Sequence, residues 1–278
     1  MLHTTELAGL DPTGARLVSW SSRAIWHLPE TQAAVAITRP HTRTREQVAG
    51  EARAVCAATS ADVRTPRLLA GPFELPQHRF GLVFEWLEGK TLSGDEAWPL
   101  AVAQAVRLAT APPGGLPLLS MHLPAPQERR VDVLGPSLEI AFMNRWRLAS
   151  STVAGLLQDG PLVLCHGDLQ PANVLVDDMG EGWLIDLEHA CLAPPEWDPA
   201  KMMILARRFG GPAEPAALLS AWPPLDRSRR NACIAAQETL NVGWLVQMAM
   251  QGTPGAAREA RRRAQGLHGG GPPWRHLC

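Results

Sequence analysis

Short runs of mostly apolar, small and β-branched residues recur in the first 90 positions of the chain, and turn residues bound these runs. Such runs are typical of strands. An apolar spacing of three to four residues then predicts a helix over residues 45–58. This region is therefore expected to form an antiparallel sheet with one inserted helix. The runs that predict strands are residues 16–20, 24–28, 33–38, 68–73 and 80–86.

The pattern changes after Gly89, where helical spacing dominates. A Pro-rich connection covers residues 112–136, and a short apolar run at residues 162–165 predicts one more strand. Two further strands, residues 174–176 and 183–185, flank a turn sequence typical of a hairpin. The predicted helices are residues 97–109, 138–157, 199–208, 213–221, 226–250 and 255–265.

Taken together, these elements predict an α+β chain with two lobes. A small lobe with an antiparallel sheet and one helix would cover residues 1–88, and a larger, mainly helical lobe residues 89–278. The joint between them is expected near Glu85 to Gly89. No internal repeat interrupts this order.

Charge and composition exclude several classes of protein. The chain has 26 Lys and Arg against 27 Asp and Glu, so no global field favours nucleic acid. No apolar stretch reaches the roughly 18 residues that a membrane helix needs, and no signal-peptide pattern begins the chain. The five cysteines show no CxxC spacing, which argues against a zinc ribbon. We therefore expect a cytoplasmic protein without nucleic-acid or membrane partners, as a monomer or weak dimer.

One segment carries groups suited to chemistry: residues 166–173, with the sequence HGDLQPAN. Asp168 and Asn173 lie in one loop between two apolar strands, and Asp186 ends the second strand of the predicted hairpin. That hairpin would return Asp186 to the level of Asn173. Oxygen ligands of this kind suit Mg²⁺, and a second carboxylate can accept a proton from a hydroxyl.

The combination HGDLQPANVLVDD and WLIDLEHA closely resembles the catalytic segment of the aminoglycoside phosphotransferase family, which has a protein-kinase-like fold. The resemblance implies that Asp168 is the catalytic base facing an acceptor hydroxyl. It implies that Asn173 and Asp186 hold Mg²⁺ against the nucleotide phosphates, and that His166 braces the loop. Phosphoryl transfer depends mainly on such positioning and charge neutralisation.

The resemblance continues with lower specificity. The sequence VFEWLEG looks like the hinge between two kinase lobes, so backbone groups around Glu85, Trp86 and Leu87 would bind the base of ATP or GTP. Glu51 looks like the helix glutamate that pairs a phosphate-binding cation. Asp198 resembles the downstream aspartate that stabilises the catalytic loop.

The chain departs from the family pattern in two places. Its two lysines, Lys90 and Lys201, cannot be the strand lysine that contacts the phosphates, because Thr38 stands where that lysine would be. The next residue, Arg39, is the cation predicted to replace it. The second departure is the phosphate loop, which has no glycine and offers the backbone and hydroxyls of Ser21 and Ser22 instead.

The resulting hypothesis is an ATP-dependent phosphotransferase with an alcohol group as acceptor. By resemblance, the acceptor is an antibiotic, an aminoglycoside or a cationic peptide of the viomycin and capreomycin type, and the outcome is resistance. Three alternatives stay open. They are a kinase for a metabolite such as choline or homoserine, a catalytically dead nucleotide-binding protein, and a metal hydrolase with His166, Asp168, Asp186 and His189 as ligands.

Overall fold

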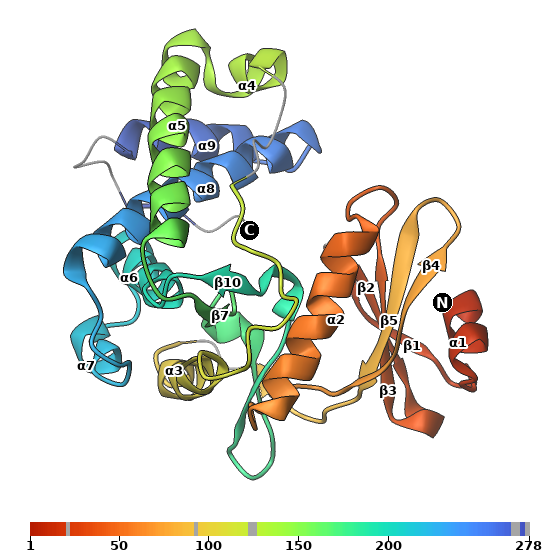
Figure 1. The fold of residues 1–278 in the computed structure, drawn as a ribbon. Helices are drawn as coiled ribbons and strands as arrows, with labels where there is room; N and C mark the ends of the chain where they lie inside the picture. The colour runs from red at the N-terminus through yellow and green to blue at the C-terminus, as the bar shows by residue number, and fades with distance from the viewer. Residues whose placement is uncertain (21–22, 92–93, 122–126, 268–272, 276–278) are drawn as a thin grey trace. The chain divides into compact units, whose positions relative to one another are not determined.

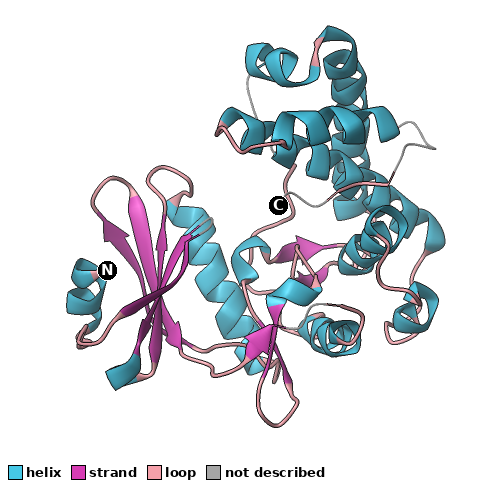
Figure 2. Cartoon of the chain, turned by 180° about the vertical axis from the view of Figure 1, so that it is seen from behind, coloured by secondary structure: helices cyan, strands magenta, loops and turns pink. Residues whose placement is uncertain are grey.

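A computed structural model describes residues 1–20, 23–91, 94–121, 127–267 and 273–275. The chain packs into two compact units. The first unit comprises residues 1–118 and 163–192, and the second comprises residues 119–162 and 193–278. Strands belong to the first unit, whereas helices make up nearly all of the second (Figure 2).

A five-stranded antiparallel sheet with the order β1-β2-β3-β5-β4 is the main element of the first unit. Its strands confirm all five strands expected in this region, with ends shifted by one or two residues. They are β1 (Arg16–Trp20), β2 (Arg23–Leu28), β3 (Ala33–Thr38), β4 (Leu68–Leu75) and β5 (Arg79–Glu85).

Each face of this sheet packs against a helix (Figure 1). On one face, Val48 and Ala52 of α2 (Arg45–Ser60) pack with Ala36 and Leu82. The other face packs against residues around α1 (Leu2–Ala8), a helix that the sequence pattern did not predict. Thr44 begins α2 with a capping box, in which its hydroxyl accepts from the Gln47 amide and the Gln47 side chain accepts in return.

Three short strands follow the sheet within the first unit and carry the candidate chemistry. In the order β6-β8-β9, they are β6 (Lys90–Thr91), β8 (Val174–Val176) and β9 (Gly182–Leu184). Asp177 closes the β8–β9 turn by accepting from the backbone amides of Met179 and Glu181. The predicted hairpin is thus confirmed. The unit also contains α3 (Ala97–Leu108), β7 (Val163–Cys165) and most of β10 (Cys191–Ala193).

The second unit is a helical bundle whose core joins α5, α8 and α9 around Phe142, Trp146 and Leu245. Part of the expected connection at residues 112–136 is instead a helix, α4, which the sequence pattern missed. Arg130 and Val133 of this helix are buried, so tertiary packing stabilises it. The helices are α4 (Gln127–Leu134), α5 (Pro136–Gln158), α6 (Trp197–Phe209), α7 (Pro215–Leu219), α8 (Arg227–Met250) and α9 (Ala256–Gly266).

The division into lobes of residues 1–88 and 89–278 stays a prediction. Within the described part of the chain, no helix combines the length and the apolar character needed to cross a bilayer.

Candidate active site

The loop between β7 and β8 is fixed by a buried histidine. His166 is fully buried, and its Nε2 lies 2.9 Å from the carbonyl oxygen of Ile185. Since a carbonyl only accepts, Nε2 carries the proton, and Nδ1 can accept from the Asp168 amide at 3.3 Å. The histidine therefore ties the start of the loop to the end of the hairpin.

Gly167 is required where it stands. Its φ of 83° lies in the left-handed region, and an added Cβ would come within 2.2 Å of the carbonyl oxygen of His189. Any side chain would therefore force the loop away from the segment that follows Asp186.

Asp168 and Asn173 are held together directly. The side-chain Nδ2 of Asn173 donates to the backbone carbonyl oxygen of Asp168 at 2.9 Å. The same nitrogen lies 3.4 Å from Asp168 Oδ2. Gln170 Nε2 donates to the same Oδ2 at 2.8 Å. These bonds fix the Asp168 carboxylate relative to the Asn173 side chain. They use the side-chain nitrogen of Asn173 and not its side-chain oxygen.

Asp186 follows β9 and lies beside this pair. The Ile185 amide donates to the carbonyl oxygen of Asn173 at 2.9 Å, which brings Asp186 to the level of Asn173. Asp186 has a φ of 64°, a conformation that costs free energy for a side-chain residue and is often found at functional sites. The structure thus places Asp168 beside Asn173, and Asp186 directly after the residue that bonds Asn173; their roles in catalysis stay a prediction.

Two arginines converge on one buried carboxylate beside this loop. Glu51 of α2 has a side chain only 1% exposed, and it accepts from Arg23 Nη1 at 2.5 Å and from Arg43 Nη1. Burial alone would raise the pKa of Glu51, but the two guanidinium groups hold it below its ordinary value. Burial likewise opposes the charge of Arg23, yet Glu51, Asp186 and Glu188 raise its pKa above the ordinary range.

The two arginines reach different second partners. Arg23 Nη2 donates to Asp186 Oδ1 at 2.7 Å. Arg43 Nη2 donates to the carbonyl oxygen of Glu188 at 3.1 Å, and Arg43 Nη1 lies 3.6 Å from the Glu188 carboxylate. Through Glu51, helix α2 is thus joined to the segment that carries Asp186.

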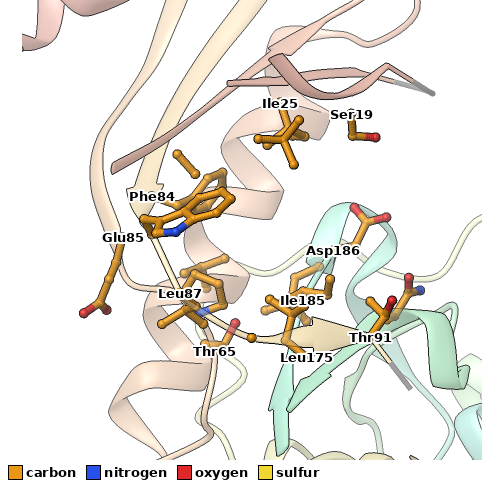
Figure 3. A pocket seen from close by; sticks show the side chains of 18 of the residues that line it. Ser19, Ile25, Thr65, Phe84, Glu85, Leu87, Thr91, Leu175, Ile185 and Asp186 are labelled. Atoms are coloured by element: carbon orange, nitrogen blue, oxygen red, sulfur yellow. The ribbon is translucent and has the colours of Figure 1, made fainter. Parts of the chain in front are cut away.

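A cavity of about 610 Å³ lies within the first unit, between the sheet and the hairpin (Figure 3). Ile25 and Phe84 on one side and Leu175 and Ile185 on the other give it apolar walls. Asp186 stands at one end, and the Glu85 carboxylate points away from it (Figure 3). The lining also includes Val18, Ser19, Arg23, Ala34, Glu51, Val55, Thr65, Pro66, Trp86, Leu87, Gly89, Thr91, Ala172, Asn173 and Leu187.

The donor set at the polar end of the cavity fits a hard cation. Asn173 and Asp186 offer amide and carboxylate oxygens, and the Asp186 side chain is 35% exposed toward the cavity that both line. Two protein ligands suit Mg²⁺, which keeps waters and binds substrate phosphates. Among the described residues, no group of three or more His, Cys, Asp or Glu could hold a metal. Both ring nitrogens of His166 also lie in hydrogen bonds, so the described residues give the metal-hydrolase alternative no support.

The structure gathers most, though not all, of the predicted site residues. Glu85, Trp86 and Leu87 line the cavity, and Glu51 pairs with Arg23 and Arg43 rather than with Arg39. Arg39 is exposed and absent from the cavity lining, so the structure does not bring it to the site. Ser21 and Ser22 lie outside the described residues. Asp198 is buried in the first turn of α6, in the second unit.

Sequence reasoning missed Arg23 and Arg43. A signal for Arg23 was present, because β2 and β3 were both predicted and an antiparallel hairpin places Arg23 opposite Thr38. Arg43 had no comparable signal, since it lies in the turn before α2 among several other arginines.

Comparisons with known proteins agree with this geometry. The sequence profile of the phosphotransferase enzyme family matches residues 13–231, well over half of the chain. A search of curated proteins finds no match.

Several solved structures share the fold. An aminoglycoside phosphotransferase of Streptomyces rimosus is 20% identical, with a TM-score of 0.59 over 85% of this chain and 96% of its own. A choline kinase of Streptococcus pneumoniae is 18% identical, with a TM-score of 0.63 over 96% of this chain and 98% of its own. A choline/ethanolamine kinase family protein of Mesorhizobium loti is also 18% identical, with a TM-score of 0.65 over 96% and 95%.

At these identities the structural likeness concerns the fold, and the family follows from the sequence profile. The antiparallel sheet with its helix, the loop of Asp168 and Asn173, and the hairpin that delivers Asp186 have the order that the resemblance predicted. The chain therefore belongs to the phosphotransferase enzyme family and is a phosphotransferase with an α+β, protein-kinase-like fold.

Proposed function

We propose that this enzyme transfers the γ-phosphate of ATP to a hydroxyl group of an antibiotic that carries amino groups. The observation that carries the proposal is that Asn173, which is hydrogen-bonded to Asp168, lines one cavity together with Asp186 and several apolar side chains. A purine base suits the apolar walls, and phosphates suit the polar end.

The hinge supports a nucleotide base. The Trp86 amide donates to the carbonyl oxygen of Gln32 at 2.9 Å, which fixes the chain where it leaves β5. The Leu87 amide, one residue on, has no hydrogen-bond partner among the described residues, and Leu87 lines the cavity. This donor is available to a ring nitrogen of the base. Solved relatives of the fold hold ADP with streptomycin, and AMP-PNP with Ca²⁺ in an amicoumacin kinase.

The proposed chemistry uses the fixed geometry of the loop. Asp168 accepts the proton of the acceptor hydroxyl while the oxygen of that hydroxyl forms a bond to the γ-phosphorus. The bond from that phosphorus to the β–γ bridging oxygen breaks, and ADP leaves with the electron pair. Mg²⁺ held by Asn173 and Asp186 would neutralise charge on the phosphate oxygens. Asn173 and Gln170 keep the Asp168 carboxylate in place throughout.

The acceptor is argued from chemistry shared by several proteins of this fold. Their names specify streptomycin, spectinomycin, choline and aminopropanol, all of which combine a nitrogen centre with a hydroxyl. We therefore place the acceptor among amino alcohols, with an aminoglycoside or a viomycin-type peptide as the antibiotic candidates. A cytoplasmic monomer or weak dimer that confers resistance completes this proposal.

A metabolite kinase is the second candidate. The structures named for choline and aminopropanol cover 96% of this chain, the same share as the amicoumacin kinase. The same active-site geometry would serve such a small acceptor.

The test is phosphate transfer from ATP and from GTP, with Mg²⁺, to a panel of aminoglycosides, viomycin, choline, homoserine and aminopropanol. Asp168→Ala is the control and should lose transfer while still binding nucleotide. Transfer to an antibiotic supports the first candidate, and transfer to choline, homoserine or aminopropanol supports the second. Nucleotide binding without transfer to any compound would instead favour the catalytically dead alternative.

A further inference from the structure

The family resemblance requires a cation at the nucleotide phosphates, and the chain has no lysine on β3 to supply it. Arg39, which follows Thr38, is exposed and absent from the cavity lining. Among the described residues that line the cavity, Arg23 alone has a cationic side chain. The site thus has one candidate for this task, and it comes from a different strand.

Strand register explains how Arg23 reaches that place. Arg23 on β2 is the direct antiparallel partner of Thr38 on β3. Directly opposed residues project from the same face of a sheet, so the Arg23 side chain leaves the sheet beside the position where the lysine is absent. Ile25 and Ala34 line the same cavity and confirm that this face of β2 and β3 points into it.

The electrostatic surroundings distinguish Arg23 from a purely structural arginine. Glu51 is already paired with Arg43, which also contacts Glu188 and the Gln47 carbonyl oxygen and is absent from the cavity lining. Arg23 is the second cation on the same carboxylate, and its other amino group holds Asp186. Because Arg43 also neutralises Glu51, Arg23 can turn its other amino group toward an anion without leaving the charge of Glu51 uncompensated.

We propose that Arg23 takes over the task of the strand lysine, and that it exchanges partners during the reaction cycle. Without nucleotide, Arg23 neutralises Asp186. When the nucleotide enters with its metal ion, Arg23 stays on Glu51 and turns from Asp186 to the phosphates. Asp186 is thereby released to the metal. This inference rests on the proposed nucleotide site, and it assigns that site's missing cation.

The experiment measures binding of ATP and of adenosine, in Mg²⁺, to the wild type and to Arg23→Met. Removing a charged hydrogen bond to phosphate should weaken ATP binding by about 10- to 100-fold. Adenosine has no phosphate, so its affinity should stay the same. Arg23→Lys, which keeps the charge but has a single donor group, should recover part of the ATP affinity.

A second measurement follows Mn²⁺ alone by the electron paramagnetic resonance signal of the free ion. Arg23→Met should bind Mn²⁺ about fivefold more tightly than the wild type, because Asp186 has lost its competing cation. The same substitution is thus expected to weaken ATP binding and to strengthen binding of the free metal. Unchanged or weaker Mn²⁺ binding would overturn the exchange of partners.

Two matched variants separate this role from structural support. Arg43→Met removes the other arginine from Glu51 and should lower Tm about as much as Arg23→Met, with a far smaller effect on ATP affinity. Arg39→Ala should change neither. If Arg23→Met weakens ATP and adenosine equally, or Arg39→Ala weakens ATP, Arg23 is not the phosphate cation. Should Arg23→Met fail to fold, Arg23→Lys and Arg39→Ala still decide the assignment.

The same binding measurements distinguish a failure of the proposed nucleotide site from a failure of the Arg23 assignment. A wild type that binds neither ATP nor GTP would overturn the nucleotide site and the assignment of Arg23 together. A wild type that binds ATP, alongside an Arg23→Met variant that binds it equally well, would overturn Arg23 alone.

Discussion

Buried glutamates pair with arginines in both units, but they do so in two different ways. In the second unit each such glutamate has a fixed place within the helical packing. Arg130 and Glu139, for example, have side chains 7% and 6% exposed and are joined at 2.9 Å. Arg208 and Glu238 repeat this arrangement, whereas Glu259 has Arg263 at 3.1 Å and Arg262 at 3.8 Å. In the first unit, Glu51 holds two arginines, and one of them faces a cavity and reaches a second carboxylate.

The difference shows what a buried ion pair can be used for. A buried pair with no cavity beside it contributes specificity to packing, and the loss of one partner leaves a charge uncompensated. A carboxylate with two cations beside a cavity can keep one of them while the other serves a ligand. Mutation of a second-unit pair should therefore change mainly stability, whereas mutation of Arg23 or Asp186 should also change nucleotide binding or activity.

The largest expected effect is on activity in the first unit. Asp186→Ala removes a proposed metal ligand and should lower kcat/KM by about 100-fold or more. Stability should change little, because this side chain is 35% exposed and its pair with Arg23 is partly solvated. Steady-state kinetics and thermal melting of the same preparation check both statements. Full activity in the variant would remove Asp186 from the metal site.

The corresponding change in the second unit should affect stability instead. Arg130→Met leaves Glu139 buried without its partner and should cost about 3–5 kcal/mol of unfolding free energy. The double variant with Glu139→Leu removes both charges and should regain most of that loss. Urea denaturation measures the stability, and kcat of the folded fraction should match the wild type. A single variant with wild-type stability would show that this pair does not stabilise the fold.

The comparison also shows which features a sequence can disclose. Short apolar runs between turn residues predicted the sheet and the hairpin, and helical spacing predicted the long helices. Helix α4 was missed, since its buried Arg130 and neighbouring prolines hide the apolar pattern of a short helix. Helix α1 was missed for a related reason: it has seven residues and packs by one side only.

The site follows the same rule. Asp168, Asn173 and Asp186 were predicted together because loop and hairpin lie close in the sequence. The contact of Arg23 with Glu51 and Asp186 joins segments up to 163 positions apart, and only the strand register could have suggested it. Arg39 was predicted because it is next in sequence to the position of the missing lysine. Proximity in sequence does not tell on which face of the sheet a side chain projects.

A smaller effect is expected from Glu51→Gln. Arg23 and Arg43 keep their second partners in this variant, so it should lose about 2 kcal/mol at pH 7. In the folded state the pKa of Glu51 is held below its ordinary value of 4.5. As the pH falls, Glu51 is therefore protonated in the unfolded state before it is protonated in the folded state. The stabilisation is therefore complete above pH 4.5 and declines below it. Denaturation of both proteins across this range should show their difference shrinking only at the acidic end, and a difference that shrinks near neutral pH would contradict this assignment.

The smallest expected effect concerns His27, which stacks on Trp86 of the cavity lining. It is 3% exposed, and the two ring centroids lie 3.9 Å apart. Burial, assisted by the Arg16 guanidinium, holds the pKa of His27 below its ordinary 6.5 against a weaker opposing effect of Glu88. Below that pH the unfolded state therefore binds more protons than the folded state, and stability falls. His27→Phe keeps a ring on Trp86 but cannot titrate, so between pH 7 and pH 5.5 its Tm should fall less than that of the wild type, by about 2 °C. Parallel slopes in the two proteins would mean that this histidine titrates alike in both states, and that acid sensitivity near neutral pH arises elsewhere in the chain.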